Sequence, residues 1–365
     1  MVACGGDSAA PPAPLPVEVA GGAGAYGMFD PSLARDPATG RLWMSYSAVV
    51  PVASDPPGAP WGVGLRLAWS DDRGGSWQDA GVWASPFRET TLAVDLPASP
   101  EPPIPAGSPI AVQSETSTLV HDPGDASTPW KLLWHQVPWA NGSPYFVSYS
   151  WIAMKAAATP EALAGALPVA LFGGHGLQDA LGTPAIALDT TAPELSGCVF
   201  AEPGLLASPG ALQLTLDCHV LGPTATSSVV LFECASPCAM AEAASWRYVG
   251  RILDAADAQA VGPGYTGFSG TALAEQGGST YLLATPVVGE RYDGCRVYRF
   301  ADLSTGAIER SAGRPVTVRR VSGLPGTHHG ACAHHEELDA GILYSQLMGL
   351  SPPDFRVYGS GIALP

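Results

Sequence analysis

Short strand-like runs, some apolar throughout and some alternating with the two-residue period of β-strands, recur along the chain between turn residues. Residues 29–49, FDPSLARDPATGRLWMSYSAV, contain an apolar run, the turn signal Pro-Ala-Thr-Gly and a second alternating run. The same form recurs at spacings of roughly 60–90 residues, with a polar residue at the start of each copy. Its copies are residues 29–49, 114–136, 200–220, 268–287 and 328–347.

Further strand-like runs follow each of these hairpins. They are residues 64–81, 148–163, 227–238, 295–306 and 354–364. Helical patterns are rare, and residues 160–167 predict no more than a short turn of helix. We therefore expect an all-β fold, a five-bladed β-propeller with four antiparallel strands per blade. Closing the ring removes the exposed edges that an open sheet must protect.

One expected turn carries a specific motif. Residues 70–77, SDDRGGSW, fit the Asp-box pattern Ser-x-Asp-x-Gly-x-Ser-Trp at every position. Asp72 would accept backbone N–H bonds, Gly74 would supply the unusual backbone angle, and Trp77 would pack beneath the turn. The motif looks like those of sialidases and other propellers, which implies a structural turn on the outer rim.

Composition agrees with many short strands joined by turns. The chain has 365 residues, of which 46% are hydrophobic, and it contains 43 Gly and 36 Pro. Charged residues make up 14%, below the roughly 25% of typical soluble proteins. The net charge of −16 argues against nucleic acid as a partner, because phosphate binding needs clustered basic residues. No run of 18 apolar residues is present, so we expect no transmembrane helix.

The first residues suggest an exported protein. Val2-Ala3-Cys4-Gly5 resembles the end of a bacterial lipoprotein signal, although the charged and apolar regions that normally precede it are missing. Residues 1–20 are therefore expected to form a lipoprotein-like N-terminus and a flexible Pro/Ala-rich tether, and 21–365 a single propeller domain. An ordinary disordered N-terminus is the alternative. We expect a monomer that is a cell-surface or periplasmic lipoprotein, or is secreted, and that meets a membrane only through a lipid on Cys4.

The other cysteines are even in number, which suits disulfides in an exported protein. Two of them lie in the short segment CASPC, residues 234–238, and two flank one predicted hairpin. The expected pairs are Cys234 with Cys238, Cys198 with Cys218, and, by what remains, Cys295 with Cys332. Metal binding is the rival explanation, but the chain contains no Cys-x-x-Cys pair.

The innermost strands of a propeller all begin at one end of the central channel. The repeat would place Asp30, Glu115, Glu202, Ser269 and the pair His328-His329 there. Several buried carboxylates in one place are costly unless a metal, a proton or a substrate relieves their repulsion. Paired acids suit glycoside hydrolysis, which needs one carboxyl group to donate a proton and another to activate water or attack the sugar. Nucleophile-elbow, P-loop and His-Glu-x-x-His motifs are absent from the sequence.

Three stretches resemble the five-bladed hydrolases of glycoside hydrolase family 43 and its relatives, the arabinanases, xylosidases and arabinofuranosidases. They are FDPS (29–32), AEPGLLASPGALQL (201–214) and GTHHGACAHHEELDAGILYSQ (326–346). The resemblance implies that Asp30 is the general base, Glu202 the general acid and His329 a channel residue beside Ca²⁺ or water. Glu115 would take the site of the family's third carboxylate, but the family uses Asp there and Glu115 stands in QSETS. No cofactor is required, and a structural Ca²⁺ in the channel is the metal that the resemblance allows.

A carbohydrate substrate would need side chains around these acids. We expect contributions from Tyr26, Trp134, His135, Tyr265, Ser269 and His328. Aromatic faces stack on sugar rings, although Trp134 is equally suited to the core. Asp30 and Glu202 could each instead cap a turn before a proline.

Two functional hypotheses follow. In the first, the protein is an exported, inverting glycoside hydrolase whose Asp30 and Glu202 carboxylates lie about 6.5–9.5 Å apart. In the second, it is a non-catalytic cell-surface propeller that binds glycan or protein, and its acids point into hairpin turns rather than into the channel.

Overall fold

Strands make up most of the fold. The structure is a computed structural model, in which one short α-helix, α1 (Ala255–Val261), is present in the described part of the chain. The described residues are 13–22, 24–52, 61–92, 95, 103–140, 143–144, 150–173, 185–220, 226–288, 291–321, 327–328, 330–350 and 352–365. The expected helical turn is a 3₁₀ helix at Glu161–Ala164, and further 3₁₀ helices lie at Leu188–Thr190, Pro193–Leu195, Ala243–Ser245 and Leu303–Thr305.

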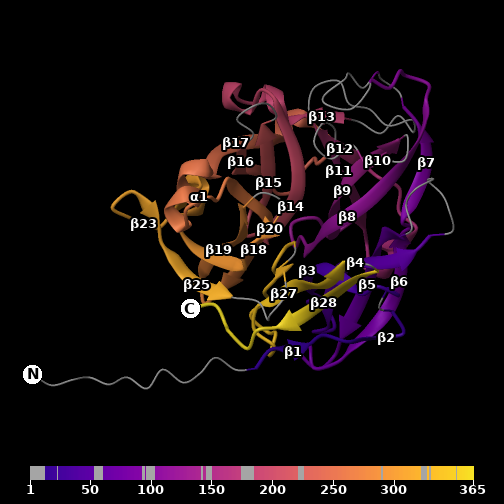
Figure 1. The fold of residues 1–365 in the computed structure, drawn as a ribbon, viewed down its shortest axis with the longest axis horizontal. Helices are drawn as coiled ribbons and strands as arrows, with labels where there is room; N and C mark the ends of the chain where they lie inside the picture. The colour runs from indigo at the N-terminus through magenta and orange to yellow at the C-terminus, as the bar shows by residue number, and fades with distance from the viewer. Residues whose placement is uncertain are drawn as a thin grey trace, which may run out of the picture.

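The strands form a five-bladed β-propeller, as the repeat predicts (Figure 1). Blade 1 contains, from the axis outward, β3 (Met28–Arg35), β4 (Leu42–Pro51), β5 (Trp61–Ser70), β6 (Trp77–Ala84) and the parallel β2 (Val19–Ala20). Blade 2 contains β8 (Pro109–His121), β9 (Trp130–Ala140), β11 (Trp151–Ala157) and β12 (Ala170–Gly173), with β7 (Phe87–Thr91), β10 (Ser143–Pro144) and β13 (Ala185–Ala187) added. Blade 3 contains β14 (Cys198–Ser208), β15 (Ala211–Val220), β16 (Thr226–Ala235) and β17 (Trp246–Leu253).

The last two blades are joined in one hydrogen-bonded sheet. Blade 4 contains β18 (Gly267–Gln276), β19 (Ser279–Val288), β21 (Cys295–Asp302) and β25 (Thr317–Val321), with β22 (Ala307–Ile308) also on β21. Blade 5 contains β26 (Thr327–His328), β27 (Leu343–Leu350), β28 (Pro353–Gly359) and β1 (Leu15–Pro16). The strand β20 (Arg291–Tyr292) pairs with both β19 and β26 and so connects the two blades. A small hairpin of β23 (Arg310–Ser311) and β24 (Arg314–Pro315) lies outside them.

The hydrophobic core is divided among the contacts between blades. On β9, Leu132 and Trp134 pack against blade 1, whereas Leu133 packs against blade 3. Similar clusters join blades 1 and 5, 3 and 4, and 4 and 5. Because each blade is covered on both faces, successive side chains of an inner strand are buried on opposite sides. This explains why the strands read as apolar on both faces rather than as simple alternation.

The ring closes where the two ends of the chain meet. Strand β1 pairs with β28 in the register Leu15↔Gly359, and Phe29 of blade 1 stacks on Phe355 of blade 5 with ring centroids 4.7 Å apart. Strands β1 and β2 lie within the residues expected to form the tether. The boundary at residue 20 and the lipid on Cys4 stay predictions, because residues 1–12 lie outside the described residues.

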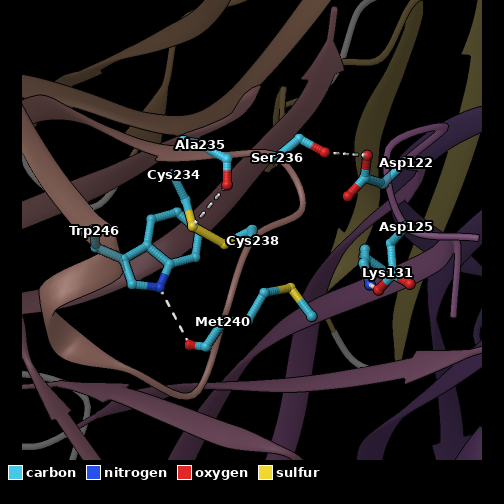
Figure 2. Close-up of a disulfide and its surroundings, with 9 residues drawn as sticks. All are labelled: Asp122, Asp125, Lys131, Cys234, Ala235, Ser236, Cys238, Met240 and Trp246. Atoms are coloured by element: carbon cyan, nitrogen blue, oxygen red, sulfur yellow. Dashed lines mark hydrogen bonds and ion pairs between the residues drawn. A yellow bond between two sulfur atoms is a disulfide. The ribbon is translucent and has the colours of Figure 1, made fainter. Parts of the chain in front are cut away.

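Two of the three expected disulfides are present. Cys198–Cys218 links the paired strands β14 and β15, and Cys234–Cys238 closes the turn after β16. Figure 2 shows the second bond beside Trp246, whose Nε1 donates to the Met240 carbonyl at 3.2 Å.

The third expected disulfide is wrong. Cys295 and Cys332 are buried free thiols. They interact as thiols, and this contact and above all burial hold the pKa of Cys332 well above its usual range. The fold therefore brings together the two residues that elimination paired, but a buried thiol packs as a small apolar group without a covalent bond.

The motif at residues 70–77 forms the turn between β5 and β6. Asp72 Oδ1 accepts a hydrogen bond from Ser76 N at 2.9 Å, Gly74 has φ +87°, and Trp77 is buried. The assignment of this turn as an Asp-box stays a prediction. In the described part of the chain, no helix has the length and apolar character needed to span a bilayer.

Candidate active site

Four of the five innermost strands are interrupted at the axis by a β-bulge. In β3, for example, the register slips between Phe29 and Ser32. Comparable slips occur in β8, β14 and β18. At each interruption one residue has a positive φ, and a fifth such residue follows β26. These residues are Asp30 (+49°), Thr116 (+44°), Glu202 (+48°), Gly270 (+61°) and Gly330 (+68°).

The bulges correct the alignment of the repeat. Asp30 and Glu202 are equivalent, as predicted, but Thr116 rather than Glu115 occupies their position in blade 2. In blade 4 the equivalent residue is Gly270 rather than Ser269, and in blade 5 it is Gly330 rather than the His328-His329 pair. The prediction matched polar residues at the start of each hairpin, whereas the extra residue of a bulge shifts the position that faces the axis.

Asp30 connects three blades. Thr116 Oγ1 donates to Asp30 Oδ2 at 2.6 Å, Ala331 N donates to Oδ1 at 2.6 Å, and Asp30 N donates to Ser345 Oγ at 3.1 Å. Only 2% of the residue is exposed. Burial, followed by the negative charge of Glu202, raises the pKa of the Asp30 carboxyl well above its ordinary value, although the two donors oppose this.

Glu202 binds the bulge of the next blade. Ser269 Oγ and Gly270 N both donate to Glu202 Oε2. Burial alone would raise the pKa of Glu202, but hydrogen bonds from Ser269 and from the carboxyl group of Asp217, with the positive charge of His135, lower it below its usual value. The carboxylate is therefore stabilised as an anion.

Asp217 lies directly against Glu202 and was not predicted. On β15 the side chains of Thr215, Asp217 and His219 share one face, because alternate residues of a strand do so. That face meets blade 4, since Thr215 Oγ1 and Thr271 Oγ1 are 3.1 Å apart. Burial and the charge of Glu202 raise the pKa of Asp217 well above its ordinary value. Burial lowers the pKa of His219.

Glu115 and His135 form a second pair beside the axis. They are register partners on β8 and β9, with Glu115 Oε1 3.5 Å from His135 Nδ1. Gln113 Nε2 donates to Glu115 Oε2 at 3.3 Å. Only 4% of His135 is exposed, and its ring nitrogens form no hydrogen bond within the described residues.

Tyr292 of β20 was also missed. The charge of Glu202 raises the pKa of its hydroxyl most strongly, followed by burial and then by Asp30, Glu115 and Asp217. All four carboxyl groups therefore act on one side chain. The cluster lies at the axis, so the acids do not point into the hairpin turns that the binding-only hypothesis requires.

Sequence reasoning could have found only part of this set. Asp217 stands in LTLDCHV, where an acid interrupts an otherwise apolar strand, and that interruption is a usable signal. Thr116 gave no signal, since a neutral residue at a bulge looks like any strand residue. Tyr292 lies in a two-residue strand outside the repeat, so only the tertiary structure brings it to the axis.

Three of the expected substrate-binding residues pack against apolar clusters. Trp134 is buried in the core between blades 1 and 2, edge-on to Trp83. Tyr265 packs beside blade 4, and its hydroxyl donates to Asp293. Tyr26 packs against a small apolar cluster of blades 1 and 5. Trp134 is therefore a core residue, whereas substrate contacts by the partly buried Tyr26 and Tyr265 stay predictions.

The remaining expected residues are one serine and three histidines. Ser269 and His135 join the carboxyl cluster as described above. His328 is buried, lies 3.4 Å through Nε2 from Thr285 Oγ1, and stacks on Tyr344. His329 lies outside the described residues, so its predicted role with a metal has no structural description. Among the described residues, no group of three or more His, Cys, Asp or Glu side chains is arranged to hold a metal ion.

A cavity at the opposite end of the axis from the carboxyl cluster has leucine side chains in its lining. The cavity has a volume of about 370 Å³ and is lined by equivalent residues of the inner strands, among them Leu33, Leu119, Leu205 and Leu273. Each follows its bulge by three residues, or about 10 Å of strand. The carboxyl cluster and this cavity therefore occupy different ends of the axis.

Comparison with known proteins shows a likeness of fold. No protein-family model and no curated protein matches this chain. A thermostable family-43 glycoside hydrolase is similar, with a TM-score of 0.50 and 10% identity over 93% of this chain and 90% of that chain. An endo-arabinase from Bacteroides thetaiotaomicron has a TM-score of 0.49 and 12% identity, over 96% of this chain and 97% of the other.

A longer protein is similar over part of its length. A GH32 β-fructofuranosidase from Bombyx mori has a TM-score of 0.48 and 11% identity, and the match covers 88% of this chain but 55% of that one. At such identities the comparisons concern the fold alone. The family-43 structure confirms the resemblance of fold that the sequence motifs predicted.

Proposed function

We propose that this protein is a glycoside hydrolase and that Asp30 and Glu202 are its reacting carboxyl groups. The observation that carries the proposal is that both acids occupy equivalent bulges at the axis, where the charge of Glu202 raises the pKa of Asp30. Two carboxyl groups whose pKa values are driven apart provide the acid and the base that glycoside hydrolysis needs. The fold of a family-43 glycoside hydrolase agrees with this by analogy.

In the proposed inverting mechanism, Asp30 activates a water molecule and Glu202 protonates the leaving oxygen. This requires one proton on the Asp30–Glu202 pair, located on Glu202. In the free protein the same proton is favoured on Asp30, because the pKa of Asp30 is raised and that of Glu202 is lowered. The reactive form therefore differs from the resting form by the position of one proton. A sugar that displaces water from Glu202 raises the pKa of Glu202 and favours this transfer.

The expected role of Glu115 changes with its position. It is one residue from the bulge and pairs with His135, which in turn lowers the pKa of Glu202. We propose that Glu115 orients His135 rather than acting on the acid directly. Export also remains part of the proposal, since disulfides persist in oxidising compartments.

The experiment is a hydrolysis screen on plant and bacterial polysaccharides with the wild type, Asp30→Asn and Glu202→Gln. Each substitution should lower the rate at least about 100-fold, the usual contribution of general acid–base catalysis. Glu89→Gln, an exposed acid on β7, is the control that should retain full activity. NMR of the first product should show inversion at the anomeric carbon.

Two results would contradict the proposal. One is hydrolysis by both variants at the wild-type rate, which would place the chemistry elsewhere. The other is glycan binding without hydrolysis by the wild type, unchanged in Asp30→Asn, which would support the binding-only alternative.

A further inference from the structure

The second strand of each blade carries one side chain beside the bulge. Its position is defined by register: it pairs with the residue just before the bulge, as Ser47 pairs with Phe29. In blade 5 the position is Ser345, because Gln346 pairs with His328. The five residues are Ser47, His135, Asp217, Thr285 and Ser345.

Three members of this ring are hydroxyl residues that bind the backbone of the next blade. Ser47 Oγ accepts from Thr116 N at 3.1 Å, and Ser345 Oγ accepts from Asp30 N at 3.1 Å. Thr285 Oγ1 donates to the Gly330 carbonyl at 3.2 Å. A neutral hydroxyl is therefore sufficient to join neighbouring bulges.

The two ionisable members both adjoin Glu202. Asp217 is on the same blade, and His135 is on the preceding blade. A buried ionisable group costs more free energy than a buried hydroxyl unless it is neutral or paired. The exception to the hydroxyl pattern thus coincides with the one bulge that carries a glutamate.

Asp217 is poorly supported as an anion. It is 0% exposed, and neither carboxyl oxygen accepts a hydrogen bond from a protein N–H or O–H group within the described residues. The nearby donors, Ser269 Oγ and Gly270 N, form their hydrogen bonds with Glu202. They also act on Asp217, but they lower its pKa less than burial and Glu202 raise it. A neutral acid at Asp217 needs no donor, and its own O–H has an acceptor in the Glu202 carboxylate.

We propose that Asp217 is a positioning residue that remains protonated and donates its O–H to Glu202, completing a set of three donors around that carboxylate. The direction of the Asp217 pKa shift agrees. Other titratable groups face Glu202 as well: His135 on β9, His219 on β15, Asp30 on β3 and Tyr292 on β20. The role in catalysis rests on the proposed function, whereas the protonation of Asp217 does not.

The first test is spectroscopic and needs no activity. In protein labelled with ¹³C in its aspartate side chains, infrared spectra at pH 7 should show neutral carboxylic acids from Asp30 and Asp217. Asp217→Asn should remove one of these two contributions, and Thr285→Val, the equivalent substitution in blade 4, should remove neither. An unchanged spectrum of Asp217→Asn would mean that Asp217 is ionised and would overturn the proposal.

The second test follows the titration of Glu202 by ¹³C NMR of labelled glutamate. Asp217→Leu removes the donor, so the pKa of Glu202 should rise by about one unit or more. Asp217→Asn keeps a donor in its amide and should leave that pKa near the wild-type value, as should Thr285→Val. If Asp217→Leu does not fold, the infrared spectrum of Asp217→Asn still shows whether Asp217 is protonated.

Where hydrolysis is found, its pH profile adds a third readout. The acidic limb should move to higher pH in Asp217→Leu and stay in place in Asp217→Asn. A titration of Glu202 that is the same in Asp217→Leu and in wild type would contradict the proposal. Absence of hydrolysis would count against the proposed function alone, since the first two tests do not depend on it.

Discussion

At the scale of residues, the site depends on strained backbone. Asp30, Thr116 and Glu202 have left-handed conformations that cost an L-residue about 1–2 kcal/mol each. The surrounding hydrogen bonds hold this strain, and strain of this kind gathers at functional sites. The sequence singled out Asp30 and Glu202 because both begin copies of the repeat and both stand in stretches that resemble family 43. It missed Asp217, which matters because it lies against Glu202 and changes the pKa of that residue.

Gly330 tests how closely the blades approach at Asp30. A Cβ atom at Gly330 would lie 1.8 Å from Asp30 Oδ1, so Gly330→Ala must displace that carboxyl group. We expect a loss of about 1–3 kcal/mol in the free energy of unfolding, as for other overpacked sites, measured by urea denaturation. Gly313→Ala is the matched control, since Gly313 also has positive φ but a Cβ atom there would meet no other atom within 4 Å. Equal losses in both variants would show that the close approach is unimportant.

The paired carboxyl groups predict a bell-shaped dependence of hydrolysis on pH. The reactive form holds one proton on the Asp30–Glu202 pair. Activity should fall at low pH when Glu202 also takes up a proton and both acids are protonated. Because the pKa of Glu202 is lowered, this limb should lie below the ordinary glutamate pKa of about 4. It should fall at high pH when the pair loses its last proton, well above that value, because the pKa of Asp30 is raised. Rates measured across pH check both limbs, and two limbs near pH 4 would contradict the coupling.

At the scale of elements, the hairpin was predictable and the bulge was not. Apolar alternation on either side of a turn signal identifies two paired strands, and all five expected strand pairs are present, although the first strand of blade 5 is only Thr327–His328. The register slip inside the first strand carries no such pattern, because the residue with positive φ differs in type from blade to blade. For this reason the alignment assigned Glu115 instead of Thr116 to the axis.

The two disulfides of blade 3 should differ in their contribution to stability. The Cys198–Cys218 bond spans 20 residues, and the Cys234–Cys238 bond spans 4. By loop-closure entropy, replacing both cysteines with alanine should cost about 3 kcal/mol for the first pair and about 2 kcal/mol for the second. Chemical denaturation of the two double variants measures the difference. A larger loss for the short loop would show that contacts such as Trp246 beside Cys234, rather than chain entropy, dominate.

At the scale of the molecule, stability depends on closing the ring. The contacts between blades 5 and 1 join residues from opposite ends of the chain, among them Phe29 with Phe355 and Asp30 with Ala331. These contacts form only when the whole ring is assembled. The shared axis also explains how side chains separated by many residues come to act on one tyrosine.

Phe355→Ala tests whether the ring unfolds as a unit. Phe355 is largely buried against Phe29, so its truncation should cost about 3–5 kcal/mol. The slope of unfolding free energy against denaturant should stay unchanged if all blades unfold together. A smaller slope, or separate transitions seen by fluorescence and circular dichroism, would mean that blade 5 detaches first. Val82→Ala, an exposed position on β6, is the control.

The sequence by itself determined the number of blades, the hairpins, two disulfides and the two acids at equivalent positions of the repeat. These follow from local patterns: strand periodicity, turn residues, cysteine spacing and a repeated charged position. Only the tertiary structure decided which side chains surround the acids. Asp217, His135 and Tyr292 reach the axis through register and ring closure, and their effect on Glu202 depends on burial and distance. Those quantities come from the assembled ring, since no single strand contains them.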